Sequence, residues 1–236
     1  RGCAFCIGRL VARMNMKKIN IDKSYLLLKK WWESIDLTNY EKCNLNKEII
    51  SLNQQLFRLK EKKLRIGIYG KAGVGKSSIL NLLLEKNDFK TDIINGTTKN
   101  IDRKELSCKH RSLKTIELID CPGFDFCDIK DPENIFWEVN SSEIILFTIA
   151  GDTNRNEASK INLFINNGKK IILVFNKIDI WNKHDIKNIC KNIRLKLPQH
   201  INIPIIINSK NNIKNQLSDL VTRYGEILLT LNSLQL

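Results

Sequence analysis

The stretch GKAGVGKS at residues 70–77 has the composition and spacing of a phosphate-binding loop, G-x-x-x-x-G-K-[ST]. Its glycines leave backbone N–H groups open to crowded phosphate oxygens, and a helix starting after the loop would add its N-terminal dipole. Lys76 is placed to reach the β- and γ-phosphates, and Ser77 offers a hydroxyl to Mg²⁺. The predicted phosphate-binding residues are Gly70, Lys71, Ala72, Gly73, Val74, Gly75, Lys76, Ser77 and Ser78.

Three further candidates would complete a metal and γ-phosphate site. Thr97 or Thr98, in INGTTKN at residues 94–100, offers a hydroxyl and a carbonyl to Mg²⁺ and the γ-phosphate, and we favour Thr98. Asp120 ends an apolar strand, where a carboxylate can hold the metal through water. Gly123 comes three residues later, so its backbone N–H can contact the γ-phosphate. The predicted metal ligands are Ser77, Thr97, Thr98 and Asp120, and the predicted catalytic residues are Lys76, Thr98 and Gly123.

The segment NKID at residues 176–179 indicates which base is bound. It follows the apolar run KIILVF, so Asn176, Lys177 and Asp179 would stand at the end of a buried strand. Asp179 can accept two hydrogen bonds from guanine N1–H and the exocyclic amine, a pair that adenine does not offer. The expected ligands are therefore GTP and GDP with Mg²⁺, and an ATPase or kinase is disfavoured.

Short apolar runs alternate with helical patterns from Leu64 onward. Strands are predicted at 64–69, 113–120, 143–150, 170–176 and 203–208, with a more polar edge strand at 101–108. Helices are predicted at 76–86, 154–167, 183–196 and 212–232. Continuous apolar strands indicate a sheet covered on both faces, which predicts a three-layer α/β/α sandwich with a mostly parallel sheet of about six strands.

Residues 1–63 differ from this pattern and predict an α-helical N-terminal arm before a nucleotide-binding domain at 64–236. Leucine and isoleucine recur at spacings of four and three over 45–59, and 24–35 predicts a second helix. Trp31 and Trp32 either pack this arm on the domain or anchor it at a membrane surface, and we favour packing. We interpret the first 13 residues as an extension that is not native.

The composition is that of a globular protein with a strongly basic balance. The chain has 42% hydrophobic and 27% charged residues, with a formal net charge of +14. Part of that charge reflects the lysine-rich and asparagine-rich usage of an AT-rich genome, and part favours an anionic partner such as RNA or a lipid surface. No apolar run approaches the roughly 18 residues that span a bilayer, and the scattered cysteines suit a reducing cytoplasm.

The order GKAGVGKS, GTT, DCPG, NKID resembles the five-box translation-factor class of P-loop GTPases. Within that class, residues 64–236 are most similar to the Era- and TrmE-like bacterial group and the 50S ribosome-binding GTPase family. The fifth box would be NSK, in which Ser209 presents a backbone N–H to guanine O6 and Lys210 completes the nucleotide site. The resemblance implies a GTP-hydrolysing switch that acts on ribosome or structured RNA, with dimerisation through the GTPase domain and peripheral membrane contact as weaker alternatives.

Phe124 departs from the pattern of fast hydrolases. Ras-like relatives carry a water-orienting glutamine directly after this glycine, whereas the resembled bacterial group carries a hydrophobic residue. Potassium-activated relatives carry an asparagine where this chain has Gly73, so potassium should not stimulate it. We therefore expect slow intrinsic turnover with mobile switches at 87–100 and 121–137. The alternative is a regulatory module that binds GTP or GDP with negligible hydrolysis.

Overall fold

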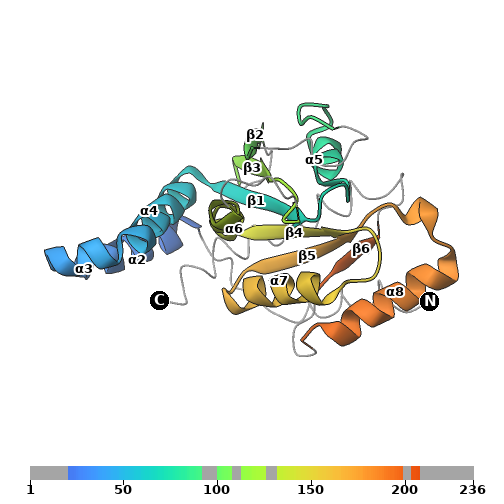
Figure 1. Cartoon of the computed structure of the whole chain (residues 1–236). Helices are drawn as coiled ribbons and strands as arrows, with labels where there is room; N and C mark the ends of the chain where they lie inside the picture. Colours follow the sequence, from blue (N-terminus) through green and yellow to red (C-terminus); the bar gives the residue numbers. More distant parts are fainter. Residues whose placement is uncertain (1–20, 92–99, 108–112, 126–131, 199–202, 208–236) are drawn as a thin grey trace, which may run out of the picture.

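A six-stranded sheet with helices on both faces forms the main body of the protein (Figure 1). The computed structural model describes residues 21–91, 100–107, 113–125, 132–198 and 203–207. The strand order is β2-β3-β1-β4-β5-β6, and β2 runs antiparallel to β3 while the other neighbours are parallel. The strands are β1 (Lys63–Gly70), β2 (Asp102–Ser107), β3 (Thr115–Asp120), β4 (Ile144–Ile149), β5 (Lys170–Phe175) and β6 (Ile205–Ile207).

Two apolar clusters lie on opposite faces of this sheet, because alternate side chains of each strand point to opposite sides. Helix α5 (Lys76–Leu84) packs on one face against Ile66 and Ile68 of β1. The other face carries α6 (Pro132–Asn140), α7 (Arg155–Asn166) and α8 (Lys183–Lys196). Every residue of β4 is buried, as the continuous apolar run predicted. The three-layer α/β/α architecture and the edge position of β2 are confirmed.

The N-terminal arm consists of α2 (Ile21–Ser34), α3 (Asn39–Asn44) and α4 (Asn46–Glu61). Leu28 of α2 and Leu56 and Leu59 of α4 are buried in the same cluster as β1. Trp32 packs against that cluster, whereas Trp31 is exposed, so one tryptophan of the pair serves packing. Because the arm shares the core of the sheet, its division from residues 64–236 as a separate domain stays a prediction.

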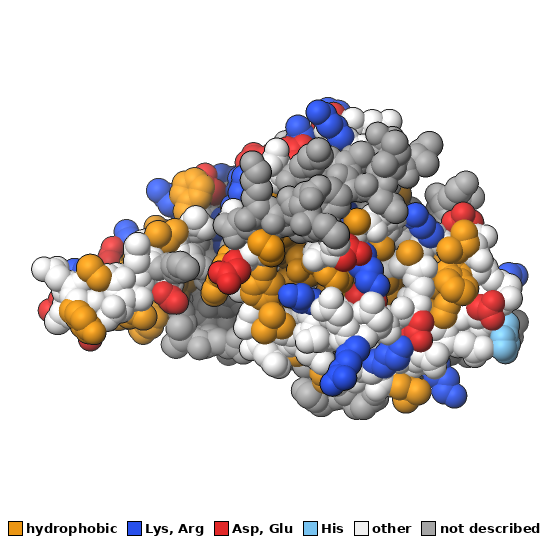
Figure 2. Space-filling model, in the orientation of Figure 1, with side chains coloured by type: hydrophobic (Ala, Val, Ile, Leu, Met, Phe, Trp, Pro, Cys, Tyr) orange, Lys and Arg blue, Asp and Glu red, His pale blue; other side chains and the backbone are white. Residues whose placement is uncertain are grey.

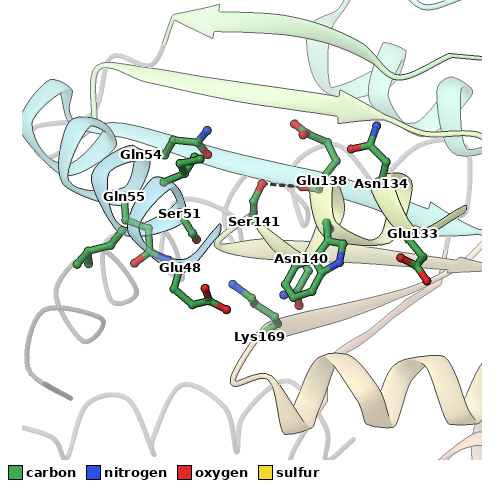
Figure 3. A pocket seen from close by; sticks show the side chains of 13 residues that line it. Glu48, Ser51, Gln54, Gln55, Glu133, Asn134, Glu138, Asn140, Ser141 and Lys169 are labelled. Atoms are coloured by element: carbon green, nitrogen blue, oxygen red, sulfur yellow. Dashed lines mark hydrogen bonds between the residues drawn. The ribbon is translucent and has the colours of Figure 1, made fainter. Parts of the chain in front are cut away.

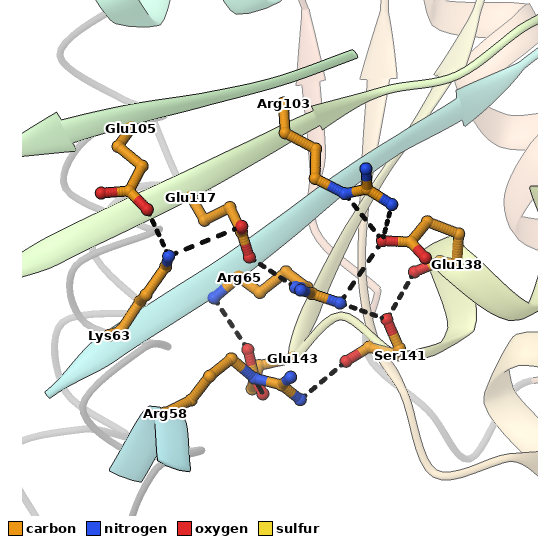
Figure 4. Close-up of polar contacts among 9 residues, drawn as sticks. All are labelled: Arg58, Lys63, Arg65, Arg103, Glu105, Glu117, Glu138, Ser141 and Glu143. Carbon is orange, nitrogen blue, oxygen red and sulfur yellow. Dashed lines mark hydrogen bonds and ion pairs between the residues drawn. The ribbon is translucent and has the colours of Figure 1, made fainter. Parts of the chain in front are cut away.

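An ionic network fastens α4 to the sheet and to the end of α6 (Figure 4). Arg58 is buried and donates to the Glu143 carboxylate at 2.8 Å and to the Ser141 carbonyl at 3.0 Å. The other Glu143 oxygen accepts the backbone N–H of Arg65 at 2.7 Å. The Arg65 guanidinium pairs with Glu117 of β3 at 2.6 Å. The network therefore joins the arm, β1, β3 and the start of β4.

Three elements within the described residues were not predicted, namely α3, α6 and a short 3₁₀ helix at Ile178–Ile180. The segment 36–44, between the two predicted helices of the arm, was not assigned to a helix, yet α3 forms there because Thr38 and Glu41 make a capping box. Helix α6 was not predicted, since its residues were assigned to a mobile switch. The predicted helix at 212–232 lies outside the described residues. Across the described segments, no helix is both long and apolar enough to cross a bilayer.

Candidate nucleotide site

The phosphate-binding loop connects the end of β1 to the start of α5, as its motif predicts. Gly75 has φ 89°, and a Cβ there would lie 2.3 Å from the side-chain nitrogen of Asn176. The left-handed backbone and the close approach together require glycine at this position. Since α5 begins at Lys76, its first N–H groups face the loop and can receive an anion.

Lys76 is held inside the loop. Its side chain is 6% exposed, and Nζ donates to the carbonyl of Lys71 at 2.7 Å. Burial lowers the pKa of Lys76, while the nearby charges of Asp120 and Asp125 oppose that effect. A phosphate group beside this ammonium would favour its charged form, so the environment suits an anionic ligand.

Ser77 and Asp120 bring two oxygen donors together at the base of the loop. The Ser77 hydroxyl donates to the Asp120 carboxylate at 2.5 Å, and Asp120 is almost fully buried at the end of β3. Hydroxyl and carboxylate oxygens are ligands that Mg²⁺ accepts, so this donor set fits the expected metal. The other predicted ligands, Thr97 and Thr98, lie outside the described residues. Within the described segments, no cluster of three His, Cys, Asp or Glu side chains offers another metal site.

The guanine motif is joined to the phosphate-binding loop by a hydrogen bond. Asn176 follows β5, and its side-chain nitrogen donates to the Val74 carbonyl at 2.8 Å. Lys177 adopts the left-handed conformation with φ 55° and caps the short 3₁₀ helix η1 (Ile178–Ile180). Asp179 lies on η1 with its side chain exposed, which leaves its carboxylate accessible to a base. Ser209 and Lys210 lie outside the described residues.

The ring of Phe124 is anchored in the apolar cluster beneath the loop. It stacks on Tyr69 with centroids 5.3 Å apart and approaches Phe147 at 6.4 Å. The backbone N–H of Phe124 donates to the Gly70 carbonyl at 3.3 Å. These contacts agree with a packing role for the ring.

Two acidic residues that touch the loop were not assigned by the sequence. The Asp125 carboxylate accepts the backbone N–H of Ala72 at 2.6 Å, and Glu157 of α7 pairs with Lys71 at 3.4 Å. Asn154 and Glu157 form a capping box whose spacing is readable from the sequence. The contacts with the loop are not readable, because they join residues far apart in the chain.

A groove lies between α4 and α6, away from the predicted nucleotide-binding residues (Figure 3). Its volume is about 550 Å³, and Ile50 and Trp137 are exposed at its wall. Hydrophobic and acidic side chains gather where the arm meets the sheet (Figure 2). The polar side chains that line the groove include Glu48, Glu133 and Lys169 (Figure 3). None of the predicted nucleotide-binding or metal residues lines this groove.

Comparisons with known proteins agree with this geometry. Residues 65–177 match the family model described as 50S ribosome-binding GTPase. The tRNA modification GTPase MnmE of Mesoplasma florum is 28% identical over 86% of this chain and 52% of its own length. GTPase Der of Nautilia profundicola is 34% identical over 49% of this chain and 26% of its own length.

A solved structure gives the same fold. A variant of Era from Aquifex aeolicus bound to GDP.AlF4- aligns with a TM-score of 0.56 at 26% identity, over 71% of this chain and 56% of that chain. This chain thus spans about half of the MnmE relative and a quarter of the Der relative.

Proposed function

Because the chain carries a P-loop GTPase domain of the translation-factor class, we propose that it binds GTP and GDP with Mg²⁺ and hydrolyses GTP as a molecular switch. The observation that supports this is the meeting of three motifs at the carboxyl ends of the parallel strands β1, β3 and β5. Ser77 contacts Asp120, and Asn176 contacts the loop carbonyl of Val74. This edge of an open α/β sheet is where ligands bind.

Each motif would have a distinct task in that reaction. The loop N–H groups and Lys76 would hold the phosphates, and Ser77 and Asp120 would hold Mg²⁺, which neutralises phosphate charge when bound. Asp179 would select guanine. Thr98, or Thr97 in its place, and the N–H of Gly123 would contact the γ-phosphate, and Ser209 and Lys210 would complete the guanine pocket.

Turnover is expected to be slow. Phe124 takes the position after Gly123, and its ring packs on Tyr69 rather than offering a polar group to water. A regulatory module with negligible hydrolysis remains the second candidate, since the same anchored ring fits it. Single-turnover hydrolysis of labelled GTP with Mg²⁺ separates the two, because only the switch releases phosphate.

The chain's partners and location are proposed from its charge and its relatives. Those relatives are described as ribosome-binding and tRNA-modification GTPases, and this chain carries a net charge of +14. We infer a ribosomal or structured RNA partner in the cytoplasm, ahead of dimerisation through the GTPase domain or contact with a membrane surface. Filter binding of ribosomal RNA at several salt concentrations, with GTP and with GDP, tests this proposal.

Nucleotide selectivity tests the core of the proposal. The protein should bind GTP far more tightly than ATP, and Asp179→Asn should remove most of that preference and favour xanthine nucleotides. Asp185→Asn, at a partly exposed position on the neighbouring helix α8, is the matched control and should bind normally. Equal affinity of the unmodified protein for GTP and ATP would contradict a guanine site at residues 176–179.

A further inference from the structure

The segment from Gly123 to Asp125 is fastened to the phosphate-binding loop by three contacts. The Asp125 carboxylate accepts the N–H of Ala72 at 2.6 Å, and the N–H of Phe124 donates to the Gly70 carbonyl at 3.3 Å. Gly123 packs so closely that a Cβ on it would lie 2.2 Å from the Ala72 nitrogen. The segment therefore lies directly against the loop that is expected to hold phosphates.

Asp125 adds a negative charge at this position. Its carboxylate lies at the N–H of Ala72, the neighbour of Lys71, whose carbonyl accepts the Lys76 ammonium at 2.7 Å. Phe124 is anchored on Tyr69, but Asp125 itself is exposed to solvent. The Asp125 side chain can thus leave Ala72 without disturbing the apolar cluster.

We propose that Asp125 is a specificity-determining residue that favours GDP over GTP by holding the Gly123–Asp125 segment on the phosphate-binding loop. The inference rests on the proposed function, in which Lys76 and the Gly123 N–H contact the γ-phosphate. A γ-phosphate there meets the Asp125 carboxylate as a like charge, whereas GDP lacks that group. GTP must therefore displace Asp125 from Ala72 before the site can close around it.

The isosteric variant Asp125→Asn removes the charge and keeps an acceptor oxygen. The ratio of affinities for a non-hydrolysable GTP analogue and for GDP should rise about tenfold at low ionic strength. The rise should be smaller at high salt, because an exposed charge is screened. Asp36→Asn, at an exposed position in the N-terminal arm, is the control and should leave the ratio unchanged. A ratio within about twofold of the unmodified protein in Asp125→Asn would overturn the proposal.

A second measurement needs no nucleotide. Amide hydrogen exchange at Ala72 in the nucleotide-free protein should be slow when Asp125 accepts that N–H and faster in Asp125→Ala. Equal exchange in the two proteins would overturn the contact, even where the variant binds nucleotide normally. Failure of the unmodified protein to bind any guanine nucleotide would instead contradict the proposed function.

Discussion

The buried position of Arg58 predicts how much its replacement should lower the free energy of unfolding. The side chain is 4% exposed and is paired with Glu143, which is also buried. Replacing Arg58 with Met keeps most of the volume but leaves the Glu143 carboxylate without its cation. Removing one partner of a buried pair costs about 3–5 kcal/mol. Because Glu143 keeps the backbone N–H of Arg65, we expect about 3 kcal/mol, the lower end of that range.

Urea unfolding followed by far-UV circular dichroism measures this loss, and thermal melting should show a midpoint about 6–12 °C lower. The double variant Arg58→Met with Glu143→Gln should lose less than the sum of the two single variants, by about 1–3 kcal/mol. The neutral amide needs no cation and can still accept the Arg65 N–H.

The matched control is an exposed ion pair in the same arm. Lys29 and Glu33 lie 3.5 Å apart with half-exposed side chains, so Lys29→Met should cost at most about 0.5 kcal/mol. A folded Arg58→Met variant that loses no more stability than Lys29→Met would refute the argument that the buried pair holds the arm. Additive single variants would show that Arg58 and Glu143 do not act together.

Three other outcomes follow from the site and the network. Phe124→Leu should leave basal GTP hydrolysis within about threefold in single-turnover assays, since the ring packs on Tyr69; a collapse of hydrolysis in a GTP-binding variant would show that the ring shapes the reacting site. Exchange of sodium for potassium should not change the rate, given Gly73, and a large stimulation would overturn this. Burial raises the pKa of Glu117, but its pairs with Arg65 and then Lys63 lower the pKa by more, so the net shift is downward from the ordinary value of a glutamate. The stability from these pairs is therefore present above pH 4.5 and lost as pH falls below it, and Glu117→Gln should flatten that loss in urea titrations.

The sheet could be predicted because its strands are continuous apolar runs, and burial on both faces requires such runs. The candidate site was placed from the sequence because its motifs lie at the ends of strands on the same edge of the sheet. Lys76 and Ser77 follow β1 through the loop, Asp120 ends β3, and Asn176 follows β5. Helix α6 was not predicted because its first residues fall within 121–137, a segment assigned from the sequence to a mobile switch.

Contacts between residues far apart in the chain could not be predicted from the sequence. Arg58 and Glu143 are 85 residues apart, and Ala72 and Asp125 are 53 apart. No sequence spacing indicates either contact, because each one depends on how separate helices, strands and loops pack together. The capping box of Thr38 and Glu41 is different, since its three-residue spacing was visible and predicts a helix start.

The Arg58 contact also affects whether a movement of the Gly123–Asp125 segment can shift helix α6. Helix α6 follows that segment in the chain, and its far end is held where Arg58 binds the Ser141 carbonyl and Arg65 binds the Ser141 hydroxyl. A shift of α6 as one body would break these bonds, so the arm should confine nucleotide-dependent change to the start of α6. In Arg58→Met, a GTP analogue should therefore speed amide exchange at the last turn of α6, whereas in the unmodified protein that turn should stay protected. Identical exchange in both proteins would mean that the arm does not restrain the helix.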